Sequence, residues 1–191
     1  MDTGHAAWVL TSASLVLLMT PGLALFYGGM TRAGSVLNMM MMSFGAIGVV
    51  TVVYVLWGWS MSYGTDVLGD GVAGLSGNPF ESFGLSGVAD GDYVEVGFQM
   101  TFAILATALI SGAIADRTRF STWLVFCAVW VTLSYFPLAH MVWGGGFLSG
   151  APGALVTSLL GDVVPVDYAG GTVVHINAGV AGLVLAVVVG E

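Results

Sequence analysis

The sequence contains very few charged residues, and almost none of them are basic. Only 7% of its 191 residues are charged, whereas a soluble globular domain carries about 25%. The basic residues are three arginines, Arg32, Arg117 and Arg119, which are too few to form a nucleic-acid-binding surface. The single cysteine, Cys127, excludes an internal disulfide framework and a cysteine metal site.

Apolar residues take the place of the missing charges. Hydrophobic residues make up 57% of the chain, and its mean hydropathy is +0.95. A chain of this composition cannot cover its surface with polar groups in water, but it needs no such cover in lipid. Glycine occurs 29 times, which suits close contact between membrane helices. We therefore predict an all-α, polytopic membrane protein.

Five apolar stretches are long enough to cross a bilayer. A helix needs about 20 apolar residues to span the hydrocarbon core, and uncharged stretches of that length lie at about residues 8–28, 36–63, 96–115, 121–144 and 170–190. The connections at 64–95 and 148–166 contain glycine, proline and acidic residues, which is typical of surface loops. We expect residues 1–191 to form a single transmembrane domain.

The charges orient the predicted bundle. The three arginines lie in the connections between spans one and two and between spans three and four, and the positive-inside rule makes that face cytoplasmic. In a plasma membrane, the N-terminus then lies outside the cell and residue 191 lies in the cytoplasm. The first span is not a typical signal peptide, because no basic residue precedes it. Acidic residues dominate the other face: Asp66, Asp70, Glu81, Asp90, Asp92, Glu95, Asp162 and Asp167.

Polar residues inside the spans need partners or a function. Asn38, Gln99 and Asn177 are expected to form hydrogen bonds between helices. His175 is the ionisable residue in the fifth span, and such residues usually serve transport. Because histidine exchanges protons near neutral pH, we predict that it lines a path or handles protons. The alternative is a structural histidine that is bonded to a neighbouring helix.

Three further residues gather toward the predicted outer side, on three different helices. Trp143 ends the fourth span, and Phe102 lies in the outer part of the third. Trp143 is either an anchor in the aromatic belt or part of a cation–π wall. Asp167 precedes the fifth helix, where it caps the helix or adds negative potential to a pore mouth. Their location above His175 favours the functional interpretation.

Three motifs in this order resemble the ammonium transporter (Amt/Mep/Rh) family. They are PGLALFYGG at residues 21–29 followed by Arg32, AHMVWGGG at 139–146 and DYAGGTVVHIN at 167–177. The resemblance extends from about residue 6 to the end of the chain. It implies passage of ammonium or ammonia by a homotrimer with one pore per subunit, without a cofactor or metal. It also implies a PII-type regulatory protein at the cytoplasmic face.

The same resemblance assigns roles to individual residues. Trp143 matches the external recruitment site, and Phe102 matches one of the stacked gate phenylalanines. His175 matches the first of two pore histidines, and Asp167 matches an aspartate that supports the outer site. Tyr27 matches a tyrosine of the first helix near the inner path. The implied mechanism desolvates and deprotonates ammonium at the aromatic mouth and passes ammonia along the histidines.

The chain departs from the family by its length. The family has about eleven spans in two inverted repeats of five plus a final helix, with the path between the repeats, and only the first repeat is present here. Half a pore would expose its polar wall to lipid, which is costly. We therefore expect an incomplete chain whose 191 residues alone do not transport.

Three alternatives remain open at the level of sequence. An intramembrane enzyme would need a paired catalytic constellation, and no such pair lies within a span. A sensor or assembly subunit would keep the fold without conducting. A channel for another small neutral molecule would keep the fold and conduct a different solute.

Overall fold

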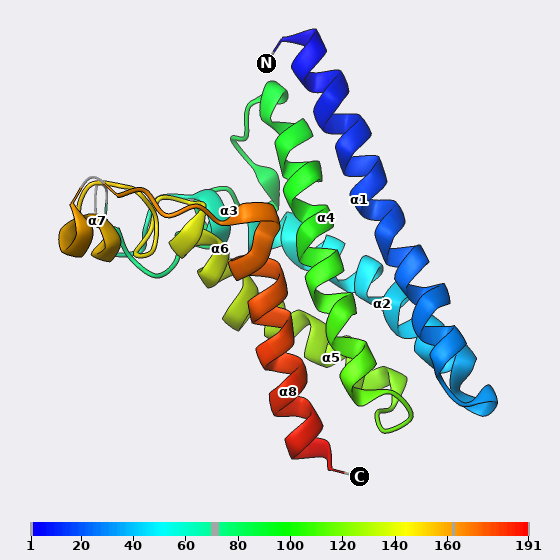
Figure 1. Ribbon diagram of the computed structural model, residues 1–191. Helices are drawn as coiled ribbons and strands as arrows, with labels where there is room; N and C mark the ends of the chain where they lie inside the picture. The colour runs from blue at the N-terminus through cyan, green and yellow to red at the C-terminus, as the bar shows by residue number, and fades with distance from the viewer. Residues whose placement is uncertain (1, 70–72, 162, 191) are drawn as a thin grey trace.

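The computed structural model describes residues 2–69, 73–161 and 163–190 as a bundle of helices (Figure 1). Five helical segments in this part of the chain are long and apolar enough to cross a membrane, which confirms the predicted all-α fold with five transmembrane helices. They cover Thr3–Met30, Ala33–Tyr63, Asp90–Ile114, Phe120–Val142 and Tyr168–Val189. Asp70, Asp162 and Glu191, which the sequence analysis assigned to the two faces, lie outside the described residues.

Only the first span is one uninterrupted α-helix. It is α1 (Thr3–Met30), which begins where the Asp2 carboxylate accepts hydrogen bonds from the Gly4 and His5 backbone N–H groups. The second span joins a short 3₁₀ turn, α2, a π turn and α3. The others likewise combine α segments with 3₁₀ or π turns. Their bounds are η1 (Ala33–Ser35), α2 (Val36–Val53), η2 (Tyr54–Gly58), α3 (Trp59–Tyr63), η4 (Asp90–Asp92), α4 (Tyr93–Ile110), η5 (Ser111–Ile114), α5 (Phe120–Trp130), η6 (Val131–Tyr135), α6 (Phe136–Val142), η7 (Tyr168–Gly170), η8 (Gly171–Ile176) and α8 (Asn177–Val189).

Helix α4 lies at the centre of the arrangement. It packs against α1 on one side and α8 on the other, and all three helices run in the same direction (Figure 1). The second and fourth spans run the opposite way behind them, α2 against α5 and α3 against α6. Large buried side chains fill the space between these layers, among them Trp123, Tyr54, Tyr135 and Phe136. The core therefore lies on one side of α4 and leaves its other side open between α1 and α8.

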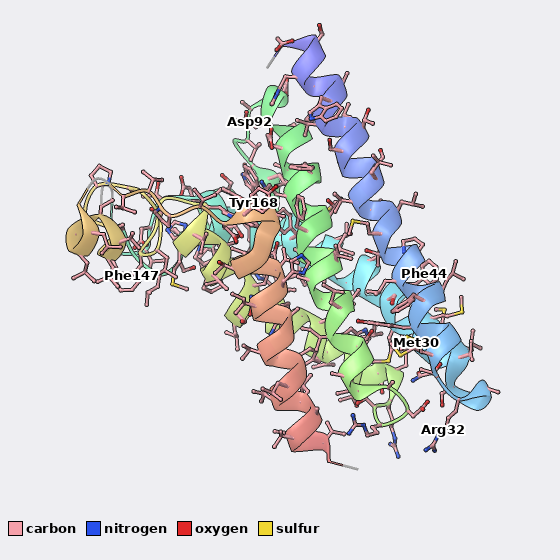
Figure 2. The ribbon with its side chains drawn as sticks, in the orientation of Figure 1. Met30, Arg32, Phe44, Asp92, Phe147 and Tyr168 are labelled. Carbon is pink, nitrogen blue, oxygen red and sulfur yellow. The ribbon has the colours of Figure 1, made fainter. Side chains whose placement is uncertain are left out.

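Figure 2 shows one acidic and one basic residue at opposite ends of the bundle. Asp92 lies near the start of α4, at the end where the chain begins, and Arg32 lies at the opposite end. The Arg117 guanidinium donates to the carbonyl oxygens of Ala113 and Gly190 and so joins the ends of η5 and α8. We call the end of the bundle near Asp92 the acidic end and the end near Arg32 the arginine end.

Two connections between spans form a lobe beside the bundle (Figure 1). One holds η3 (Phe83–Leu85), and the other holds the short helix α7 (Leu155–Leu160). The first is pinned by an isolated antiparallel bridge between Asp66 and Gly77. The two meet where the Phe147 backbone N–H donates to the Gly74 carbonyl oxygen over 2.8 Å. The lobe follows directly on the ends of α3 and α6 (Figure 1).

Candidate functional site

Trp143, Phe102 and Asp167 come together toward the acidic end. Trp143 follows the last residue of α6, and its indole Nε1 donates to Oδ2 of Asp167 over 3.0 Å. The Phe102 ring meets the indole edge to face, with centroids 6.4 Å apart and planes at 67°. Phe98 packs on Phe102 in the same manner one helical turn away, at 4.9 Å. All three predicted residues are half-buried, so the aromatic pair is partly open to solvent.

A left-handed turn places the Asp167 carboxylate. Ala169 and Gly170 have φ values of 52° and 69°, and glycine adopts this region at little cost. The turn brings the carboxylate back over the start of η8, where it accepts from the Thr172 N–H at 2.6 Å and the Val173 N–H at 3.4 Å. Asp167 therefore caps the helix, as one of the two predicted alternatives has it, and it also holds the indole.

His175 lies on the open side of α4. Its side chain is exposed and borders two adjoining grooves. One, of about 330 Å³, runs between α1 and α4 past Leu105 and Leu109. The other, of about 460 Å³, continues between α4 and α8 past Gly179 and Gly182. The histidine is therefore not buried within this part of the chain, because α1 and α8 diverge on either side of α4.

Tyr27 continues the same face toward the arginine end. It borders the larger groove together with His175. It also borders a further hollow of about 230 Å³ that reaches Met30 and Ala115. Its hydroxyl donates to the Leu109 carbonyl oxygen over 3.0 Å. Gly112 makes room for the ring, because a Cβ at this position would lie 2.7 Å from Tyr27 Cζ. Tyr27 and His175 thus line one groove, from α1 and η8 respectively.

The other polar residues of the spans differ in their partners. Ser134 Oγ donates to Asn177 Oδ1 over 2.8 Å, which confirms the predicted bond between helices. Asn38 Nδ2 reaches the Thr118 carbonyl oxygen at 3.4 Å. Gln99 Oε1 is buried and has no partner among the described residues. The prediction of an interhelical bond is therefore not met for this oxygen of Gln99.

The sequence analysis missed a buried pair beside this site. His140 Nε2 lies 3.2 Å from Asp66 Oδ2, and both side chains are only 3% exposed. Asp66 was assigned to the outer face only for its charge, and His140 appeared only as a letter of the second motif. The rule that identified His175, an ionisable residue within an apolar stretch, applies equally to His140. Its partner could not be found in this way, because Asp66 is 74 positions away.

No group of three or more histidine, cysteine, aspartate or glutamate side chains within residues 2–69, 73–161 and 163–190 is placed to hold a metal ion. The chemistry of the described face is instead that of aromatic rings, one carboxylate, one imidazole and one phenol. Such a set can attract a small cation, remove its water and offer a hydrogen-bonding partner further along.

Comparison with known proteins identifies relatives over the whole chain. The sequence model of the Ammonium Transporter Family matches residues 7–191. An ammonium transporter of Aquifex aeolicus is 47% identical and one of Mycobacterium bovis 46%, each match covering 100% of this chain and 43% of the relative. Among solved structures, Mep2 of Candida albicans superposes with a TM-score of 0.83 at 28% identity. That of Saccharomyces cerevisiae superposes with 0.82 at 30%.

The matches cover this chain completely but each relative only in part. The structural matches include 100% of this chain but only 40% and 42% of the two Mep2 chains. The chain thus spans less than half the length of the proteins that it resembles. The matching sequences are named as transporters, which argues against the intramembrane enzyme.

Proposed function

Because this chain belongs to the ammonium transporter family, we propose that it forms one half of a membrane pore that passes ammonium or ammonia. The chain is a multi-pass membrane protein, with five apolar helices. Two observed features carry the proposal. The aromatic and carboxylate cluster of Trp143, Phe102 and Asp167 lies toward the acidic end, and the groove bordered by His175 and Tyr27 continues toward the arginine end.

The first step takes place at Trp143. A cation that leaves water is attracted to the faces of aromatic rings, by about 0.5–2 kcal/mol per contact. Phe102 borders this position from α4. Asp167 holds the indole and adds negative potential, but its oxygens already accept from Trp143, Thr172 and Val173. It therefore supports the site more by fixing Trp143 than by contacting the cation.

The second step takes place along the groove. Ammonium gives up a proton near the aromatic pair, and neutral ammonia then passes His175, whose ring can accept or donate a hydrogen bond. The proton crosses by a coupled route. Tyr27 borders the same groove from α1, with its hydroxyl bonded to Leu109, and it borders the inner part of the path.

A second half is needed to close this path. His175 is exposed, and the grooves beside it are open on the side away from α4. An exposed histidine is costly when it faces lipid. We therefore propose that residues 1–191 are a single transmembrane domain, the first of two inverted repeats, and that they do not transport alone. The relatives, which are more than twice as long, are consistent with this arrangement.

The remaining proposals concern the cell. The arginine end, with Arg32, Arg117 and Arg119, faces the cytoplasm by the positive-inside rule, so the N-terminus is outside and residue 191 inside. The complete protein forms a homotrimer in the plasma membrane, and a PII-type regulator binds at its cytoplasmic face. Both follow from membership of the family.

Uptake of labelled methylammonium tests the proposed function. The complete protein, residues 1–191 together with the proposed second half, is placed in lipid vesicles beside vesicles that hold residues 1–191 alone. We expect saturable uptake that unlabelled ammonium inhibits in the first case, and uptake equal to empty vesicles in the second. Uptake by the complete protein that ammonium does not inhibit would refute the proposed substrate. Saturable uptake by residues 1–191 alone would refute the need for a second half.

A further inference from the structure

The pair formed by Asp66 and His140 lies beside the candidate site, and none of the roles assigned above uses it. Asp66 belongs to the connection that follows α3, and His140 lies on α6 three residues before Trp143. Their side chains are 3.2 Å apart and almost completely buried. A buried carboxylate and imidazole are retained against a desolvation cost, which makes the pair worth explaining.

The backbone of His140 organises the chain around Trp143. The His140 carbonyl oxygen accepts from the Gly144 and Gly146 N–H groups, each at 3.0 Å, and the Trp143 N–H donates to the Ala139 carbonyl oxygen at 2.8 Å. The carbonyl oxygen of His140 therefore holds the bend that follows Trp143 against the last turn of α6. A displacement of His140 would move the backbone that carries the indole.

Asp66 is itself fixed by the connection in which it lies. Its Oδ1 accepts from the Leu68 N–H at 2.7 Å, and the bridge to Gly77 holds its backbone. Gly74 leaves the space for its carboxylate, because a Cβ there would lie 2.1 Å from Asp66 Oδ2. Contacts within the connection thus fix the position of the Asp66 carboxylate independently of its contact with His140.

One atom of the histidine indicates the form of the contact. His140 Nδ1 is buried and has no hydrogen-bond partner among the described residues. A carboxylate oxygen accepts hydrogen bonds, so Nε2 is the donor in the contact with Asp66. The contact is therefore a single hydrogen bond from His140 Nε2 to Asp66 Oδ2.

We propose that Asp66 and His140 are a positioning pair that sets the place of Trp143 in the outer aromatic site. Trp143 is then held from two sides. Asp167 holds its indole directly, and Asp66 holds its backbone through His140. The proposal rests on the proposed function, because the positioned residue matters only if Trp143 receives the cation. Neither residue of the pair needs to contact the solute.

The test measures methylammonium uptake by the complete protein with Asp66→Asn. We expect the apparent KM to rise about tenfold, within the range for loss of a cation–π contact, while Vmax per folded protein stays within about twofold of the parent. Glu81→Gln is the control, because Glu81 holds Thr65 of the same connection but does not reach His140. An unchanged KM in Asp66→Asn would overturn the proposal.

A double-mutant cycle separates positioning from general loss of stability. In a Trp143→Leu background, Asp66→Asn should raise KM by no more than about twofold further, because both changes act through the same indole. If the two effects multiply, the pair does not act through Trp143. Should Asp66→Asn yield no folded protein, Asp66→Asn/His140→Leu removes the buried charge and its partner together, and the same rise in KM is expected of it.

Hydrogen exchange distinguishes failure of this proposal from failure of the proposed function. Amides of residues 141–149 should exchange faster in Asp66→Asn than in the parent, while those of α1 and α4 keep their rates. Unchanged exchange at 141–149 would refute the positioning role, whatever the uptake. Faster exchange at 141–149 in Asp66→Asn, together with a parent protein that shows no saturable uptake, would keep the pair as the anchor of Trp143 and refute the transport function instead.

Discussion

The indole of Trp143 donates a hydrogen bond of 3.0 Å to the carboxylate of Asp167, a residue that also caps the start of the fifth span. The end of one membrane helix and the beginning of the next are thereby held by one side chain. Asp167 therefore contributes both to the stability of the bundle and to the position of Trp143 in the candidate outer site. Mutation of Trp143 tests capture of the cation, and mutation of Asp167 tests stability as well.

Replacement of Trp143 by leucine should weaken capture of the cation. We expect Trp143→Leu to raise the apparent KM for methylammonium uptake by the complete protein about two- to thirtyfold, because a cation–π contact contributes about 0.5–2 kcal/mol. Trp8→Leu is the matched control, since Trp8 is 71% exposed on α1 and suits an interfacial anchor. Equal effects of the two replacements would mean that Trp143 is only an anchor.

Replacement of Asp167 by asparagine should lower stability as well as uptake. The carboxylate accepts from three N–H groups, those of Trp143, Thr172 and Val173. An amide turns one acceptor oxygen into a donor that faces them. We expect a loss of about 1–3 kcal/mol, measured by thermal unfolding in detergent. Asp92→Asn should change little, because Asp92 precedes α4 without a capping bond from its side chain. A stable Asp167→Asn would contradict the capping role.

A methyl group at Gly112 should displace Tyr27. The added Cβ would lie 2.7 Å from the phenol ring, and the ring cannot withdraw without straining the bond from its hydroxyl to Leu109. Gly112→Ala should therefore destabilise the protein by about 1–3 kcal/mol and slow uptake. Gly97→Ala, also in the third span, meets nothing within 4 Å and should leave both properties near those of the parent. Normal stability of Gly112→Ala would show that Tyr27 moves freely.

The five spans could be predicted from the sequence because the signal is summed over about 20 residues. A few polar residues, such as Gln99 or Asn177, do not cancel it. The interruptions within the spans could not be predicted, among them the π turn Val131–Tyr135. Such turns arise from packing between spans, and the local pattern of apolar residues carries no record of it.

Part of the candidate site was also predictable from the positions of the spans along the chain. Phe102 lies in the third span, Trp143 follows the fourth and Asp167 precedes the fifth, so the order of the spans along the chain predicts that they lie toward one end. Asp66 escaped this reasoning, because its position depends on the fold of a connection that has no regular periodicity. The openness of the groove beside His175 also depends on how far α1 and α8 diverge, a tertiary property that neither helix encodes alone.

The central claim is that the solute passes along the groove bordered by His175, and thiol modification tests it most directly. Gly179 lies one helical turn beyond His175 on the same groove, and a Cβ at this position meets no atom within 4 Å. The native Cys127 is buried. In the complete protein, a small cationic methanethiosulfonate should block methylammonium uptake by Gly179→Cys, and ammonium should slow the block. The same treatment of Gly48→Cys, on an exposed position of α2, should leave uptake intact. Unaltered uptake by modified Gly179→Cys, or equal inhibition of both variants, would contradict the claim.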